Sequence, residues 1–382
     1  MSVRGEGARS SAVSWVARHA GLLTASVVAL LVLSPALWRP GFLLHYDMVF
    51  VPDLPLSAGT LGMDGGVPRA VPNDTVVALL DLVLPGWITH RLILVGAFLA
   101  VGAGVDRWRR GVVTTVVATV AATWSPWVAE RLAIGHWGYL WGYAALGWGV
   151  LAARVVSRAR GTALAPVALV TAAVLPVVLL PGLAFARGGQ WISSSYPNEY
   201  GAVVQRLSAS SDAAAVLPWR LYRQYGWNGD ITVLDPWQRL SSSPVLVNDD
   251  LPLRDSTVRG ESAAADRVSR ALASGDAAQV KAALSRAGVR YVVVEKSQPG
   301  ADDDIRTLTP IGSVVHSGRD LTLYDIGRPS GHDGPQSLGN TPWWGATGLA
   351  LAGVTLAAGT AWLVRRRQFE RGAERHASGT SQ

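Results

Sequence analysis

The sequence predicts an α-helical polytopic membrane protein of about six spans, with an α/β domain outside the cytoplasm. Three observations support this prediction. Hydrophobic residues make up 49% of the 382 residues and charged residues only 16%, whereas about a quarter is charged in soluble domains. Several apolar segments approach the roughly 20 residues that cross a bilayer. The Lys and Arg residues gather beside those segments.

Six apolar segments are candidate spans, although the third is short. They are 21–38, 87–105, 111–124, 137–156, 162–186 and 344–364. The second, fourth and sixth end at "DRWRR", "SRAR" and "RRR". Because Lys and Arg are enriched on the cytoplasmic side of membrane helices, both termini are predicted to be cytoplasmic. The net charge of +7 is therefore a topology signal, and no nucleic-acid partner is expected.

This topology divides the chain into five parts. They are 1–20, a cytoplasmic N-terminus; 21–186, a membrane domain of five spans with outer loops 39–86 and 124–137; 187–342, an extracytoplasmic α/β domain; 343–364, the C-terminal span; and 365–382, a cytoplasmic tail. We expect a multi-pass plasma-membrane protein. The chain has no Cys, so disulfides cannot stabilise the exported domain.

The outer domain alternates between strand and helix patterns. Five stretches rich in β-branched residues are predicted strands: "DAAAVLPW", "DITVLD", "SPVLVN", "RYVVVE" and "DLTLYDI". Segments 261–275 and 276–288 are predicted helices, each ending at a glycine. The stretch "QPGADDD" is predicted to be a loop. In the first outer loop, "NDTVVALLDLVLPG" predicts a short helix that lies in the membrane interface or re-enters it.

Two carboxylates, Asp47 and Asp53, follow the first span within "YDMVFVPDL". Among large apolar residues a carboxylate costs free energy unless it is paired or used. Asp47 is the candidate catalytic base, because a carboxylate can take a proton from an acceptor hydroxyl, and Asp53 is a candidate substrate-binding residue. In the alternative interpretation, both acids are interfacial residues that bond to backbone amides or pair with Arg39. The residues alone leave both interpretations open.

The second outer loop and the second span contain further polar candidates for substrate binding. Arg131 has the planar guanidinium that binds phosphate, and Glu130 and His136 lie nearby in the sequence. Adjacent helical positions point in different directions, so no Glu130–Arg131 ion pair is expected. His90 and Arg91 lie one turn inside the second span, where charge is costly and commonly functional. Contact with lipid headgroups is the alternative role for these cations.

The stretch "LPWRLYRQYGWNGD" combines aromatic and hydrogen-bonding side chains that suit a sugar ring. Trp219, Arg220, Tyr222 and Trp227 are the candidate sugar contacts. Alternatively, these aromatic residues form the core of a strand-to-loop junction. The stretch "VNDDLPLRD" offers oxygen ligands, but its spacing does not follow the calcium-binding loop. No protein metal site is therefore predicted.

Several motifs together resemble a known family. "DMVFVPDLPLS", "WSPWVAERLAIGHWGYLWGYAALGW", "VLPWRLYRQYGWN", "VLDP" and "GVRYVVVE" resemble actinobacterial multi-pass envelope proteins related to GT-C glycosyltransferases of the arabinofuranosyltransferase type. The chain resembles a shortened member, with fewer spans before the outer domain. The resemblance implies sugar transfer from a polyprenyl-phosphate donor to an envelope glycan. It implies that Asp47 is the acidic residue of the first outer loop and that Glu130, Arg131 and His136 line the donor site.

Two functions remain open from the sequence. In the first, Asp47 deprotonates an acceptor or holds a divalent cation, while Arg131 and Arg91 stabilise the departing phosphate. No other cofactor is expected. In the second, the chain is a non-catalytic relative, anchored in the bilayer, that binds a glycan or a membrane partner subunit. Convergence of Asp47, Glu130, Arg131 and His136 on one site would favour the first function.

Overall fold

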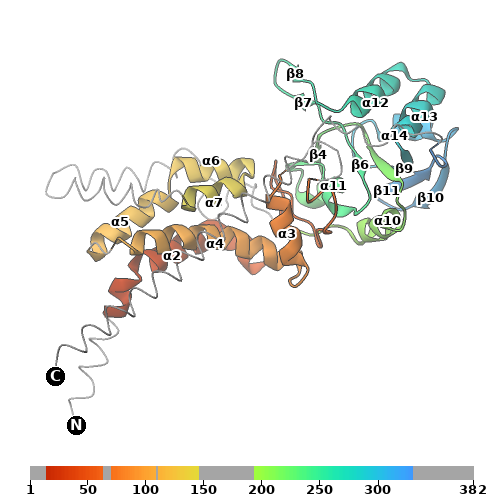
Figure 1. Ribbon diagram of the computed structural model, residues 1–382. Helices are drawn as coiled ribbons and strands as arrows, with labels where there is room; N and C mark the ends of the chain where they lie inside the picture. The colour runs from red at the N-terminus through yellow and green to blue at the C-terminus, as the bar shows by residue number, and fades with distance from the viewer. Residues whose placement is uncertain (1–13, 63–69, 109–110, 146–192, 330–382) are drawn as a thin grey trace, which may run out of the picture.

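The computed structural model describes residues 14–62, 70–108, 111–145 and 193–329. These residues form a bundle of apolar helices and an α/β region that adjoins one end of it (Figure 1). The predicted spans 162–186 and 344–364 lie outside the described residues, as do most of the predicted cytoplasmic ends and the second half of span 137–156.

The helical bundle consists of α2 (Ala20–Trp38), α4 (Gly86–Asp106), α5 (Val112–Thr123), α6 (Pro126–Ile134) and α7 (Trp137–Ala145). Glycines allow α2 and α4 to approach closely, since a Cβ on Gly102 would lie 2.5 Å from the carbonyl oxygen of Gly21. Asp106 accepts hydrogen bonds from the amides of Gly21 (2.6 Å) and Leu22 (2.9 Å). These bonds satisfy donors that the first turn of α2 leaves unpaired.

Two helical stretches of the described residues are long and apolar enough to cross a membrane, Gly86–Asp106 and Val112–Ile134. The apolar part of α2, Ala20–Ser34, is shorter. The described residues thus provide two such stretches, against the six spans that the sequence predicts for the whole chain. The predicted outer loop 124–137 is mostly helical, because Ser125 accepts a hydrogen bond from the amide of Val128 and Pro126 begins α6.

The α/β region contains a five-stranded sheet with the strand order β10-β11-β9-β3-β6. Its strands are β3 (Ala213–Leu217), β6 (Val245–Leu246), β9 (Val289–Glu295), β10 (Ser313–Ser317) and β11 (Leu321–Asp325). β3 runs parallel to β6 and β9, whereas β11 runs antiparallel to β9. The predicted α/β character is confirmed, and the sheet is mixed. The remaining predicted strand, β5 (Thr232–Leu234), pairs instead with β4 (Tyr222–Gln224) in a hairpin.

Helices cover both faces of this sheet. α12 (Ala263–Ser274), α13 (Ala277–Arg286) and α14 (Ala301–Leu308) pack on one face, and α10 (Asn198–Ser208) and α11 (Trp237–Leu240) pack on the other. Alternate residues of β9 serve the two faces: Val292 and Val294 contact the first group, Tyr291 and Val293 the second. The two predicted helices are confirmed as α12 and α13. The predicted "QPGADDD" loop was wrong from Ala301 onward, because the acids occupy the first turn of α14, where the helix dipole favours them.

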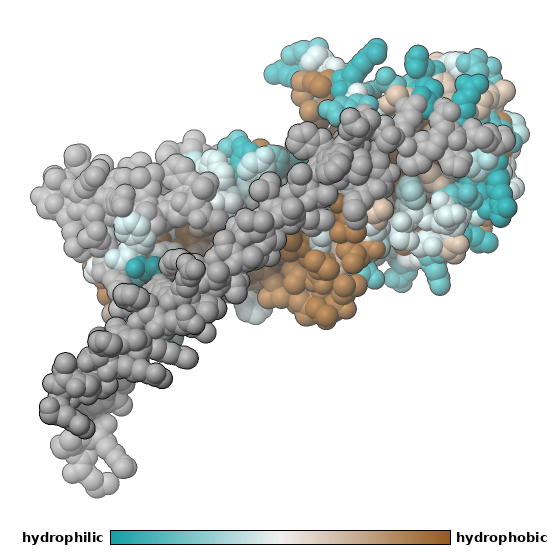
Figure 2. All heavy atoms as spheres, in the orientation of Figure 1, coloured by the Kyte–Doolittle hydropathy of each residue, from teal (hydrophilic) through white to brown (hydrophobic). Residues whose placement is uncertain are grey.

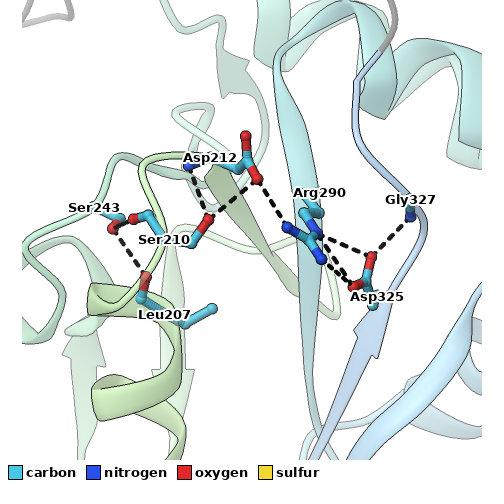
Figure 3. Close-up of polar contacts among 7 residues, drawn as sticks. All are labelled: Leu207, Ser210, Asp212, Ser243, Arg290, Asp325 and Gly327. Carbon is cyan, nitrogen blue, oxygen red and sulfur yellow. Dashed lines mark hydrogen bonds and ion pairs between the residues drawn. The ribbon is translucent and has the colours of Figure 1, made fainter.

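Arg290 forms ion pairs with two acids at one end of the sheet (Figure 3). Its Nη2 lies 2.8 Å from Asp325 Oδ2, and its Nη1 lies 3.3 Å from Asp212 Oδ2. Asp325 also accepts the amide of Gly327 (2.9 Å), and Ser210 donates its hydroxyl to Asp212 (3.1 Å). The arginine therefore links β9, β11 and the residue before β3.

Several smaller elements lie outside the helical bundle and the five-stranded sheet. β1 (Phe42–Leu43) pairs antiparallel with β2 (Ser193–Ser194), which joins the first outer loop to the α/β region. α3 (Asn73–Asp81) lies at the junction of the bundle and the α/β region (Figure 1). β7 (Leu251–Pro252) and β8 (Thr257–Val258) form an exposed hairpin.

Candidate functional site

Asp47 lies at the tip of a tight turn formed by residues 45–48. The turn is closed by hydrogen bonds between His45 and Met48, and Tyr46 has a positive φ of 43°. The apolar neighbours Met48 and Phe50 are buried in the core, whereas 36% of the Asp47 side chain is exposed. Buried apolar residues thus support the turn from below, while the carboxylate of Asp47 is accessible.

The C-terminal end of α6 holds this turn in place. The amide of Asp47 donates to the carbonyl of Ile134 (3.0 Å), and His45 Nε2 lies 2.6 Å from the carbonyl oxygen of Leu132. Burial lowers the pKa of His45, so its neutral ring donates this bond. Gly135 ends α6 with a φ of 89°, and a Cβ there would lie only 2.2 Å from the amide nitrogen of Met48. The glycine is therefore required for the close approach of α6 and the turn.

The predicted residues of the two outer loops form one chain of contacts. Asp47 Oδ2 lies 3.0 Å from His136 Nε2, and His136 Nδ1 lies 3.0 Å from Arg131 Nη1. Arginine only donates hydrogen bonds, so Nδ1 accepts and Nε2 carries the proton directed at Asp47. Arg131 Nη2 also pairs with Glu130 Oε1 at 2.9 Å. The expectation of no Glu130–Arg131 ion pair was wrong, because the two long side chains bend toward each other at the exposed end of α6.

A residue of the α/β region donates the second hydrogen bond to the carboxylate of Asp47. The hydroxyl of Tyr222, on β4, donates to Asp47 Oδ1 at 2.7 Å. The hairpin is fixed on the turn by backbone bonds, from the Tyr46 amide to the Thr232 carbonyl (2.7 Å) and from the Leu234 amide to the Tyr46 carbonyl (2.8 Å). Each carboxylate oxygen of Asp47 thus accepts one bond, and the two donors come from opposite sides of the site.

A buried charge network lies directly behind Tyr222. The next residue along β4, Arg223, points to the other side of the hairpin, as strand geometry requires, and is 1% exposed. Its Nε lies 2.6 Å from Asp235 Oδ2, and its Nη1 lies 3.1 Å from Glu295 Oε2. Burial lowers the pKa of Arg223, but the two carboxylates raise it by more, so the guanidinium stays charged.

Three aromatic donors complete this network around Glu295. Its Oε1 accepts bonds from the Trp237 indole (2.7 Å), the Tyr225 hydroxyl (2.9 Å) and the Tyr200 hydroxyl (3.3 Å). Arg223, Asp235 and Glu295 belong to "VLPWRLYRQYGWN", "VLDP" and "GVRYVVVE". Three of the motifs singled out in the sequence therefore meet in one network that supports the hairpin.

The structure places His90 and Arg91 apart from this chain of contacts. Arg91 donates to the carbonyls of Gly41 (3.0 Å), Trp87 (2.6 Å) and Arg39, so it ties α4 to the first outer loop. The His90 ring is fully buried and stacks on Phe50, with ring centroids 4.3 Å apart. Both side chains thus hold the loop that carries Asp47.

The remaining predicted sugar contacts lie in other environments. Trp219 donates its indole N–H to Ser269 (2.7 Å), and Arg220 donates to the carbonyl of Pro299 (3.3 Å). Trp227 stacks on Tyr225 within a group of aromatic rings in the core. Asp53 is exposed, and no contact joins it to Asp47 among the described residues. Tyr222 alone of the four candidates in "LPWRLYRQYGWNGD" reaches the site.

Among the described residues, no three His, Asp or Glu side chains lie close enough together to hold a metal ion. Sequence reasoning did not identify the buried partners Asp235 and Glu295. Glu295 directly follows three valines, and Asp235 follows Ile231 to Leu234; an acid at the end of a buried strand was the available signal. Tyr139 was also missed; its ring stacks on His136 with centroids 5.2 Å apart.

The described residues define a two-part protein, in which segments that connect the helices of an apolar bundle meet a mixed α/β region at Asp47. No protein-family profile matches the chain, and no curated protein is similar to it. It is similar to a cryo-EM structure of the arabinofuranosyltransferase AftD from mycobacteria, with 15% sequence identity and a TM-score of 0.32. The match covers 82% of this chain and 30% of that one. A mutant structure of AftD gives a TM-score of 0.30, also at 15% identity, covering 82% of this chain and 31% of that one.

The chain spans about 30% of the length of AftD. At these TM-scores the similarity does not define a shared fold.

Proposed function

We propose that the chain is a membrane glycosyltransferase-like protein of the cell envelope that transfers a sugar from a polyprenyl-phosphate donor to a glycan outside the cytoplasm. The supporting observation is the convergence of Asp47, His136 and Arg131 at an accessible position between the helical bundle and the α/β region. These residues belong to the motifs that resemble GT-C glycosyltransferases. The two helical stretches that are long and apolar enough to cross a bilayer fit a lipid-linked donor.

In the proposed reaction Asp47 is the general base. Its carboxylate takes the proton of an acceptor hydroxyl while the acceptor oxygen bonds to the anomeric carbon of the donor. The bond from that carbon to the phosphate oxygen breaks, and polyprenyl phosphate leaves with the electron pair. Tyr222 and His136 each occupy one lone pair of the carboxylate. A carboxylate has about four such positions, so an acceptor hydroxyl can still approach.

His136 and Arg131 have different roles in this proposal. Because Arg131 bonds to Nδ1, His136 presents Nε2–H to Asp47 and orients the carboxylate. Glu130 is 56% exposed, and an exposed ion pair contributes at most about 1 kcal/mol. A donor phosphate can therefore replace Glu130 on the planar guanidinium of Arg131 and gain two parallel hydrogen bonds.

A second candidate function is non-catalytic binding of a glycan or a membrane partner. The observation that favours it is that both oxygens of Asp47 already accept a hydrogen bond from the protein. Under this alternative, Asp47 connects the helical bundle to the α/β region and has no chemical role.

Mass spectrometry of envelope glycans distinguishes the two functions. Cells that lack the protein are complemented with the wild type, with Asp47→Asn or with Asp53→Asn. Asp53→Asn is the matched control, because it makes the same chemical change six residues away on an exposed side chain. We expect the wild type and Asp53→Asn to restore the altered glycan and Asp47→Asn to fail. Full restoration by Asp47→Asn would support the non-catalytic alternative.

A further inference from the structure

The helix α3 and the two residues that follow it carry an apolar surface that is half or more exposed. Val76, Leu79, Leu82 and Val83, here called the α3 surface, are 50%, 51%, 66% and 79% exposed. Figure 2 shows this region as a continuous hydrophobic patch where the helical bundle meets the α/β region. Four large aliphatic side chains exposed together are unusual on a surface that faces water.

The inward face of the same helix carries polar side chains beside the buried Val77 and Ala78. Asp74 is buried and pairs with Arg239 of α11, with Oδ2 lying 3.1 Å from Nε. Thr75 is buried and donates to the carbonyl of Thr60 (2.6 Å), and Asp81 accepts the amide of Leu54 (3.0 Å). A helix at the surface of a water-soluble protein carries charged or polar side chains on its outer face, whereas the outer face of α3 is aliphatic. The polarity of α3 therefore fits an apolar medium on its outer side.

The α3 surface is continuous with a helix that is long and apolar enough to cross a bilayer. Val83 lies three residues before α4 begins, and Trp87 and Leu92 extend the exposed apolar surface along α4. The guanidinium of Arg91 lies 5.1 Å from the centre of the Trp87 ring. Tryptophan and arginine at the end of a spanning helix mark the headgroup region of a membrane. The α3 surface therefore faces the same medium as the exposed apolar side of α4.

We propose that the α3 surface is embedded in the acyl chains of the outer bilayer leaflet, with α3 lying along the membrane plane. Helices of this kind bury their apolar face by about 5–10 Å. The opposite face holds the α/β region through the Asp74–Arg239 pair, and Asp81 holds the end of the loop that carries Asp47. Lipid contact of α3 therefore sets the height of the α/β region above the membrane, whether or not the protein transfers a sugar.

The absence of cysteine allows a direct test on the full chain. Single variants Leu79→Cys and Val83→Cys are labelled with an environment-sensitive fluorophore and placed in phosphatidylcholine nanodiscs. The lipids carry a quenching nitroxide either near the headgroup or near the bilayer centre. Leu30→Cys, on the exposed side of α2, is the deep-membrane control. Ala278→Cys, exposed on α13, is the aqueous control.

We expect the labels at positions 79 and 83 to lose most of their fluorescence with the shallow nitroxide and little with the deep one. Aqueous iodide should quench them far less than the label at position 278. Iodide quenching equal to that at position 278 would overturn the proposal and indicate a water-facing surface. Stronger quenching by the deep nitroxide, as at position 30, would also overturn it, because α3 would then re-enter the bilayer.

Discussion

At the scale of single residues, the contacts of Asp47 explain why a carboxylate occurs among large apolar side chains in the segment that follows the apolar helix α2. The apolar neighbours form the core beneath the turn, and Asp47 projects from it toward donors on two other segments. The neighbours of Asp47 in the sequence are apolar. The environment of its carboxylate is nevertheless polar, because His136 and Tyr222 supply hydrogen bonds. These two hydrogen bonds stabilise the Asp47 carboxylate without a metal ion or a lysine partner.

Tyr222→Phe removes one of the two protein donors to Asp47. We expect sugar transfer to slow by about tenfold, which corresponds to about 1.4 kcal/mol and is typical of a hydrogen bond to a charged group. The initial rate of transfer in membranes measures the effect. Tyr46→Phe is the control, since Tyr46 contacts the Tyr222 ring and is half exposed. Equal rates for both variants would show that the Tyr222 hydroxyl does not orient the base.

Part of this site could be predicted from the sequence. Four polar residues singled out in the sequence, Asp47, Glu130, Arg131 and His136, lie in one chain of contacts, although the Glu130–Arg131 pair was not expected. The position of Arg91 could not be predicted, because its partners are backbone carbonyls about fifty residues away in the chain. Tyr222 was singled out for sugar stacking, and its bond to Asp47 spans 175 residues. A contact between residues so far apart in the sequence depends on how the helical bundle and the α/β region pack together.

At the scale of elements, the C-terminal end of α6 positions the site. Gly135→Ala should lower both stability and transfer, because the left-handed conformation costs a non-glycine residue about 1–2 kcal/mol and the new Cβ would overlap Met48. Melting temperature in detergent and transfer rate are measured together. Gly142→Ala, where a Cβ meets nothing within 4 Å, is the control. Wild-type behaviour of Gly135→Ala would mean that the turn does not depend on this contact.

The ion pair at the end of the sheet predicts a pH dependence. Arg290 lowers the pKa of Asp325. A lowered pKa in the folded state stabilises the protein above the unfolded pKa, and this stabilisation is lost as the pH falls through the folded value. Asp325→Asn should therefore cost about 1–2 kcal/mol at pH 7 and less at pH 3. Thermal unfolding of the full chain in detergent at both pH values tests this; an equal loss at pH 3 and pH 7 would contradict it.

The strands and helices with clear patterns were predictable, whereas their pairing was not. β3, β9 and β11 follow from runs of β-branched residues, and α12 and α13 from capped amphipathic segments. β5 has the same local pattern as the sheet strands but pairs with β4, and Asp235 after it pairs with Arg223. The acids of "QPGADDD" suit both a loop and the first turn of a helix, so composition did not separate the two.

At the scale of the whole molecule, the α/β region and the helical bundle are joined at several places around Asp47. Tyr222 and the β4–β5 hairpin contact the turn, Asn228 donates to the carbonyl of Leu44 (3.0 Å), and Tyr196 donates to the carbonyl of Phe50 (3.1 Å). The candidate site therefore exists only when both regions are docked.

The buried network behind the hairpin should be essential for this docking. Arg223→Met leaves Asp235 and Glu295 buried without their cation, which costs about 3–5 kcal/mol. We expect a lower melting temperature and faster amide exchange in β4 and β5. Arg220→Met, three residues earlier and exposed, should behave like the wild type. If the two variants were equally stable, the network would not support the hairpin.

The central claim is that Asp47 takes the acceptor proton in sugar transfer. The most direct measurement is transfer of labelled sugar from a panel of polyprenyl-phosphate sugars to envelope glycan, in membranes from cells lacking the native protein. The full chain is supplied as the wild type, Asp47→Asn or Asp53→Asn. The account predicts transfer from a donor by the wild type and Asp53→Asn, and none by Asp47→Asn. Transfer by Asp47→Asn at the wild-type rate would contradict it.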